Sequence, residues 1–260
     1  PTNDMHVITV AFGAYVKSKS KFAALPRRVG MILGFVMLIW MTQILTGFTP
    51  LTSGPLVTFY DCASGERTEL SGITMGNWVA KVSNFLVDDL DVEVGTRLRL
   101  GLPPHWLRFV WLLSCWNTGV VVSDTEADIA LTGPDLDATE PIKLASALAP
   151  FGMRFGQPPA GFIDIGVDVL SHSDYFDAFA EPSPQEPAWE LDGMVVTHEE
   201  ALTAAGAGNS QRTLASGTSL AHDAHLLVSA IVGGGSLVVV RHGTDEDIQR
   251  IVEQERVTAY

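Results

Sequence analysis

The chain has 260 residues, a formal net charge of −14 and a hydrophobic fraction of 47%. This length and composition allow a substantial core and exclude disorder of the whole chain. The acidic balance argues against nucleic-acid binding, because contacts to phosphates need clustered Lys and Arg. The two cysteines, Cys62 and Cys115, lack metal-ligand spacing, so we expect free thiols and no zinc site.

The first fifty residues differ from the rest in charge and hydropathy. They hold five basic residues and one acidic residue, a net of +4, so residues 51–260 carry −18. Residues 29–47 contain no charged side chain and follow Arg27 and Arg28. Such a run is long enough to cross a membrane, with its basic flank in the cytoplasm. It also fits a helix packed on the next domain. A third interpretation is a translation start at Met31, which would remove the basic flank.

We therefore divide the chain into residues 1–50, with an apolar helix, and a domain at residues 51–260. In the domain, the hydrophobic pattern predicts strands at 55–60, 66–70, 95–100, 120–122, 129–131 and 236–240. It predicts helices at 74–90, 103–119, 142–148, 197–205, 220–232 and 245–255, with a further strand and helix within 163–179. The Pro-rich residues 181–189 favour a loop. This alternation indicates an α/β fold: a parallel or mixed sheet with flanking helices.

Several stretches of the domain carry motifs similar to those of a known enzyme family. They are Gly95-Thr-Arg-Leu98, Leu102-Pro-Pro-His-Trp106, Cys115-Trp-Asn-Thr-Gly119, Leu191-Asp-Gly-Met-Val-Val-Thr-His198, Gly233–Val240 and Ile251–Thr258. In this order and spacing they resemble the acyl-adenylate-forming, AMP-binding enzymes, which include the acyl-CoA synthetases. The resemblance covers about residues 55–260 and implies the N-terminal subdomain of such an enzyme. It is closest to short uncharacterised proteins that carry only the front part of that domain.

The phosphate-binding motif of that family is not preserved. There the motif reads roughly Thr-Ser-Gly-Thr-Thr-Gly-x-Pro-Lys-Gly, and its backbone N–H groups wrap the phosphates of ATP. Here residues 186–192 have no glycine, hydroxyl or lysine before Gly193, and Asp192 stands in place of the lysine. The sequence also ends at Tyr260, before the family's adenine-binding and ribose-binding motifs and its lid domain. We therefore expect no ATP-driven adenylation by this chain alone, and ATP or AMP binding is implied by the resemblance only.

Six residues are the candidates for a nucleotide or acyl pocket: Gly193, Thr197, His198, Ser216, Gly217 and Thr218. The first three follow the position of the phosphate loop, although Thr197-His198 also fits a capped helix start. The other three resemble the Ser-Gly-Thr core of that loop but lie after it in the chain, and they fit a turn or a helix cap. His222 and His225 share a helix face without a third ligand, so we predict no metal site, and we assign no catalytic residue.

The leading hypothesis is a non-catalytic remnant of an acyl-adenylate-forming enzyme that acts as a binding or interaction protein in the cytoplasm. Its ligand would be a protein partner, an acyl group or a nucleotide. One alternative is an enzyme: an AMP-dependent acyl-CoA synthetase or ligase, or half of a split one. Another alternative is a membrane-associated accessory protein anchored through residues 29–47.

Overall fold

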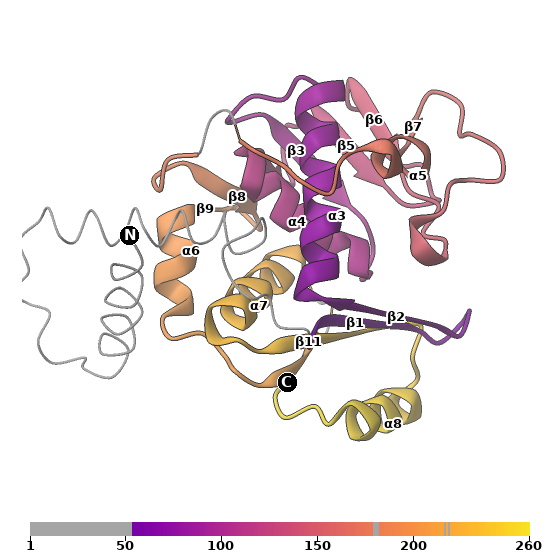
Figure 1. Cartoon of the computed structure of the whole chain (residues 1–260), viewed down its shortest axis with the longest axis vertical. Coiled ribbons are helices and arrows are strands. Elements are labelled where there is room, and N and C mark those ends of the chain that lie inside the picture. The colour runs from indigo at the N-terminus through magenta and orange to yellow at the C-terminus, as the bar shows by residue number, and fades with distance from the viewer. Residues whose placement is uncertain (1–53, 179–181, 216, 218) are drawn as a thin grey trace, which may run out of the picture. The chain divides into compact units, whose positions relative to one another are not determined.

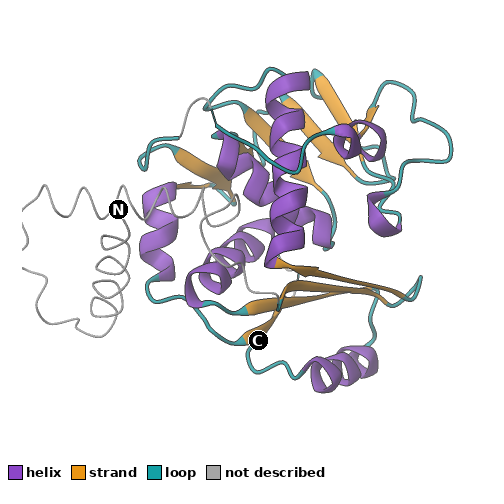
Figure 2. Ribbon diagram, viewed as in Figure 1, coloured by secondary structure: helices purple, strands orange, loops and turns teal. Residues whose placement is uncertain are grey.

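The computed structural model describes residues 54–178, 182–215, 217 and 219–260 (Figure 1). These residues form two β-sheets with helices between them (Figure 2). Helix α4 contacts strands of both sheets, and so does helix α7. The observed α/β class agrees with the sequence prediction, but the predicted single sheet is wrong because the strands divide into two sheets.

The smaller sheet has four strands and begins with the predicted hairpin. Strand β1 lies between β11 and β2, and β10 lies at the other edge; all neighbours are parallel except β1 and β2. Helix α8 covers the outer face of this sheet (Figure 1). The bounds are β1 Pro55–Asp61, β2 Glu66–Ser71, β10 Arg212–Ala215, β11 Ser236–Arg241 and α8 Asp245–Glu255.

The larger sheet has seven strands in the order β7-β6-β5-β3-β4-β8-β9. Its neighbours are parallel except β9, which runs antiparallel to β8 and lies at one edge. The strands are β3 Arg97–Gly101, β4 Val121–Ser123, β5 Ile129–Thr132, β6 Ile142–Ala145, β7 Ile163–Asp164, β8 Pro187–Leu191 and β9 Met194–Thr197. Short helical turns are at Pro150–Gly152, Ile165–Asp168 (α5) and Val169–Ser171.

The helices between the sheets contribute many of the largest side chains of the core, including Trp106 and Trp111. All thirteen residues of α4 are buried, which explains its nearly continuous apolar sequence. Ser71 caps α3 by accepting a hydrogen bond from the backbone N–H of Thr74. The bounds are α3 Gly72–Asn84, continuing into a π-helix at Phe85–Asp89, α4 Trp106–Thr118, α6 His198–Ala205 and α7 Leu220–Gly233.

Two sequence predictions in the larger sheet are wrong. The helix predicted at 142–148 is strand β6, because Leu144 and Ala145 pair with β5 on one side and β7 on the other. The loop predicted at 181–189 contains most of β8, which begins at Pro187. In both places the apolar run is too short for its period to distinguish a strand from a helix or a loop.

The apolar segment at residues 29–47 lies outside the described residues, so its helix and its membrane role stay predictions. Among the residues that the structure describes, no helix is both long enough and apolar enough to cross a membrane.

Candidate functional site

The strand pair β8–β9 occupies the place where the sequence resembles the phosphate-loop motif. A turn of only two residues, Asp192 and Gly193, joins the strands, and Leu191 pairs directly with Met194. Both turn residues have positive φ, 54° and 73°, as a type I′ hairpin turn requires. The backbone N–H of Asp192 donates to Oδ2 of Asp124 at 2.7 Å. One of the two backbone N–H groups of the turn is therefore already bonded to the Asp124 carboxylate. The two turn residues are also too few to form a loop around a phosphate.

Thr197 and His198 form the start of α6, as the simpler sequence interpretation expects. Thr197 and Glu200 make a capping box: Oγ1 of Thr197 accepts from the N–H of Glu200, whose carboxylate accepts from the N–H of Thr197. The His198 side chain is buried, and its Nε2 has no partner among the described residues. Burial lowers the pKa of His198 to about 4, so the imidazole is neutral at pH 7. His198 is thus directed into the core.

Gly217 does not join this hairpin. Gly217 follows β10 of the smaller sheet, has a φ of 63°, and lies against the ring of Pro104. Ser216 and Thr218 lie outside the described residues. Of the four candidates that the structure describes, it brings together Gly193, Thr197 and His198, on the β8–β9 hairpin and the helix that follows it.

The structure also shows a buried ion pair that sequence reasoning missed. The Arg108 guanidinium in α4 pairs with the Asp223 carboxylate in α7, and its other donors bond to the carbonyl oxygen of Leu102. Both side chains are almost fully enclosed. Burial raises the pKa of Asp223, an effect that Arg108 opposes. The one sequence signal was an arginine inside an otherwise apolar helix.

The two histidines beside this pair do not make a metal site. The backbone N–H of His222 bonds to the capping hydroxyl of Ser219. The ring of His225 packs edge-on against Trp189, with centroids 5.1 Å apart. Within the described residues no group of three His, Cys, Asp or Glu side chains could hold a metal ion.

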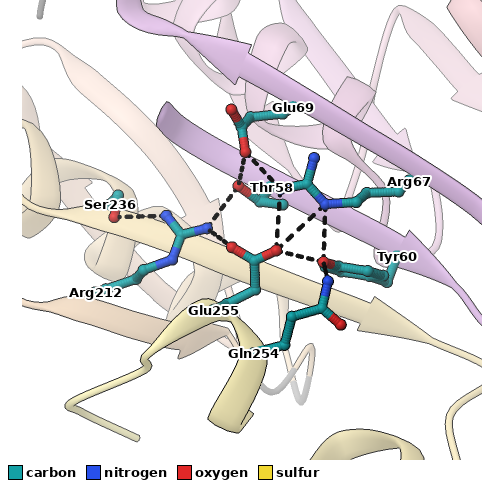
Figure 3. Close-up of polar contacts among 8 residues, drawn as sticks. All are labelled: Thr58, Tyr60, Arg67, Glu69, Arg212, Ser236, Gln254 and Glu255. Carbon is teal, nitrogen blue, oxygen red and sulfur yellow. Dashed lines mark hydrogen bonds and ion pairs between the residues drawn. The ribbon is translucent and has the colours of Figure 1, made fainter. Parts of the chain in front are cut away.

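A second polar cluster lies on the outer face of the smaller sheet and is centred on Glu255, the last residue of α8 (Figure 3). Its carboxylate accepts from Arg67, Arg212 and the hydroxyl of Tyr60. Burial raises the pKa of Glu255, but these three hydrogen bonds outweigh burial and leave the pKa below its usual value. We call these four residues the Glu255 cluster. They lie on β1, β2, β10 and α8, and their hydrogen bonds hold α8 against the sheet.

A shallow groove of about 320 Å³ adjoins the Glu255 cluster, between the β1–β2 turn and α8. Its charged side chains are already paired with neighbours. Arg250 bonds to Asp247 at 2.8 Å, and Asp61 bonds to His242 at 2.8 Å. Arg67 is held by Glu69 and Glu255. Each of these charged side chains is therefore bonded to another residue of the chain and is not free to bind a ligand. We interpret the groove and the Glu255 cluster as parts that stabilise the fold.

Comparison with solved structures defines the class of protein. The chain matches an acyl-CoA synthetase from Brucella canis with a TM-score of 0.67 and 17% identity, over 84% of this chain and 46% of the synthetase. It matches the amide bond synthetase McbA from Marinactinospora thermotolerans with a TM-score of 0.62 and 13% identity, over 85% of this chain and 47% of that enzyme. The chain therefore has the fold of part of an adenylate-forming enzyme and spans about half the length of these two.

Comparison of sequences defines the family. No family model matches the chain. It is 30% identical over 219 residues to a Mycobacterium tuberculosis protein named "TIGR03089 family protein", a match that covers 79% of this chain and 90% of the relative. The chain belongs to this family.

Proposed function

We propose that this chain is a binding or interaction protein that uses the front scaffold of adenylate-forming enzymes without forming adenylates. The observation that supports this most directly is the two-residue turn at Asp192-Gly193. A phosphate loop works because several consecutive N–H groups converge on one anion and a lysine adds positive charge. The turn offers neither, since the N–H of Asp192 is already bonded to Asp124.

Electrostatics at this turn also oppose a nucleotide. Asp124 and Asp192 are both exposed carboxylates, and the N–H bond holds them close together. A phosphate about 4 Å from either one would be repelled by about 1 kcal/mol per charge pair even in water. A triphosphate carries several charges, so the repulsion adds to the absence of donors. We therefore expect the scaffold to be kept for a ligand other than ATP.

Calorimetric titration of the full chain with ATP, AMP and an acyl-CoA tests the proposal, with a complete acyl-CoA synthetase as the positive control. We expect no saturable heat from ATP in a sample that circular dichroism shows to be folded. A parallel assay follows ATP–pyrophosphate exchange with a set of carboxylic acids, because exchange detects adenylate formation without product release. Saturable ATP binding in the micromolar range, or exchange above the protein-free rate, would refute the proposal.

A second candidate is one half of a split acyl-CoA ligase. The observation that favours it is the match to only 46% of the length of the Brucella canis synthetase. The test is to co-express the chain with a protein, encoded beside it, that carries the missing C-terminal motifs. Co-purification with ATP–pyrophosphate exchange in the mixture alone would support the split enzyme. Two folded proteins that neither associate nor catalyse exchange would count against it.

A further inference from the structure

The β9 strand presents an exposed apolar edge. It is the last strand of the seven-stranded sheet, and its outer side has no strand partner among the described residues. Met194 and Val195 are 64% and 56% exposed, although both are large apolar residues in a strand. Native proteins usually protect such edges with lysine, proline or a covering segment. The edge therefore has the properties of a surface that is covered in a complex.

The hydrogen bonds of the hairpin show which backbone groups are available there. In a two-residue hairpin, the residues that flank the turn form the bonded pair, here Leu191 and Met194. The next pair, Glu190 and Val195, therefore directs its N–H and C=O groups outward on both strands. On the β8 side this is observed, because the carbonyl of Glu190 accepts from Asp124 of the neighbouring segment. By the same geometry, the N–H and C=O of Val195 point away from the sheet.

The segment around this edge is strongly acidic. Residues 182–211 contain no Lys or Arg and hold five carboxylates: Glu186, Glu190, Asp192, Glu199 and Glu200. The loop after β4 adds Asp124, an exposed carboxylate that accepts from the backbone N–H of Asp192. The nearby Arg97 is neutralised by two bonds to Glu190, at 2.9 and 3.0 Å. A partner at this edge would therefore meet apolar side chains surrounded by carboxylates, most of which have no cationic partner among the described residues.

We propose that the β9 edge, defined as Met194 and Val195 with the carboxylates around them, binds an extended segment of a partner protein in which an apolar core is flanked by Lys or Arg. This rests on the proposed binding function and assigns it a site. The N–H and C=O of Val195 pair with one residue of the segment, as in β-strand addition. The apolar side chains cover Met194 and Val195, and the flanking cations face Asp192 and Asp124, which the Asp192 N–H bond holds beside the turn. A short edge supplies few backbone bonds, so the charges determine orientation and specificity.

The first test uses a peptide blocked at both ends with the sequence Lys-Lys-Val-Thr-Val-Lys-Lys, and the ¹⁵N-labelled full chain. NMR titration should shift the amide signals of Asp192, Met194 and Val195 first, and salt should weaken the effect. A control peptide with glutamate in place of each lysine should give no shift. Absent shifts at millimolar peptide, shifts elsewhere on the chain, or equal shifts from the acidic peptide would each overturn the inference.

The second test separates backbone pairing from charge. Val195→Pro removes the outward N–H without removing a bond to β8, and it should abolish binding, whereas Val195→Thr should retain it. A peptide methylated on the nitrogen of its central threonine makes the same test without a protein variant, should Val195→Pro fail to fold. The pair Asp192→Asn and Asp124→Asn should weaken binding by about threefold for each charge, and asparagine at 124 keeps an oxygen that can accept from the Asp192 N–H. The matched pair Asp245→Asn and Glu246→Gln, on α8, should leave it unchanged.

Two further outcomes are distinguishable. If the chain self-associates at high concentration and Val195→Pro prevents this, the edge binds a second copy and the proposed partner class is wrong. If the peptide does not bind and ATP also gives no heat, only the assignment of this edge fails. The proposal of a non-adenylating protein depends on the ATP titration and would still stand.

Discussion

Replacing Glu255 with glutamine tests whether the Glu255 cluster stabilises the packing of α8 on the smaller sheet. The carboxylate is 10% exposed and accepts from Arg67 at 3.0 Å, from Arg212, and from the Tyr60 hydroxyl. The Arg212 side chain is 14% exposed, so losing its charged acceptor should cost about 2 kcal/mol, within the range for charge-assisted hydrogen bonds. Arg67 is 41% exposed, so solvent limits its contribution to below about 1 kcal/mol.

The sum is about 2–3 kcal/mol, which for a domain of this size lowers Tm by about 4–12 °C. Differential scanning calorimetry at pH 7 measures this, with Glu253→Gln as the control. Glu253 is exposed on the same helix and its side chain has no partner among the described residues, so its replacement should change Tm by less than about 2 °C. Equal shifts for the two variants would refute the reasoning.

The same variant makes a prediction for pH. The pKa of Glu255 in the folded protein lies below its usual value. Its contribution to stability is therefore present above the unfolded pKa of about 4.3 and is lost as the pH falls through the folded pKa. The stability difference between wild type and Glu255→Gln should thus be constant at neutral pH and shrink below about pH 4. A difference that persists unchanged in acid would mean that packing, and not charge, holds α8.

Three other predictions concern separate parts of the fold. Asp223→Asn leaves Arg108 buried without its counter-charge, and urea unfolding should show a loss of about 3–5 kcal/mol; a loss below 1 kcal/mol would show that the pair is not enclosed. Gly193→Ala places a side chain at φ 73° with free space around it, so the backbone strain of about 1 kcal/mol should be the whole cost, and Asp192→Asn should cost almost nothing. His198 is neutral in the folded state with a pKa of about 4, so stability should fall by up to about 3 kcal/mol as the pH drops from 6.5 to 4. His198→Asn should flatten that slope, and an unchanged slope would assign it to other groups.

The sequence predicted the elements whose hydrophobic period is long and whose ends are marked. Helices α7 and α8 were predicted within one residue, because each has an N-cap and an extended apolar face. Strand β6 was predicted as a helix, since four residues that pair on both sides have no distinct period. The division into two sheets was also missed, because the order of strands depends on contacts distant in sequence.

The polar clusters were less accessible to sequence reasoning than the secondary structure. Arg108 and Asp223 are 115 residues apart, and no local pattern connects them. The Glu255 cluster joins Tyr60, Arg67 and Arg212 from three other elements. By contrast, the capping role of Thr197 was predicted, because a capping box involves only four consecutive residues and can be recognised locally.

The β8–β9 hairpin explains how the fold of an adenylate-forming enzyme tolerates the absence of a phosphate loop. Strand β8 is held by its pairing with β4 and by Trp189, which packs against Trp116 and His225 in the core. None of these contacts involves the turn, so replacing a long loop with Asp192-Gly193 leaves them intact. A two-residue turn also closes the hairpin at a lower entropy cost than a long loop. The contacts that hold β8 thus come from residues outside the turn, as the proposed loss of nucleotide binding with a retained scaffold requires.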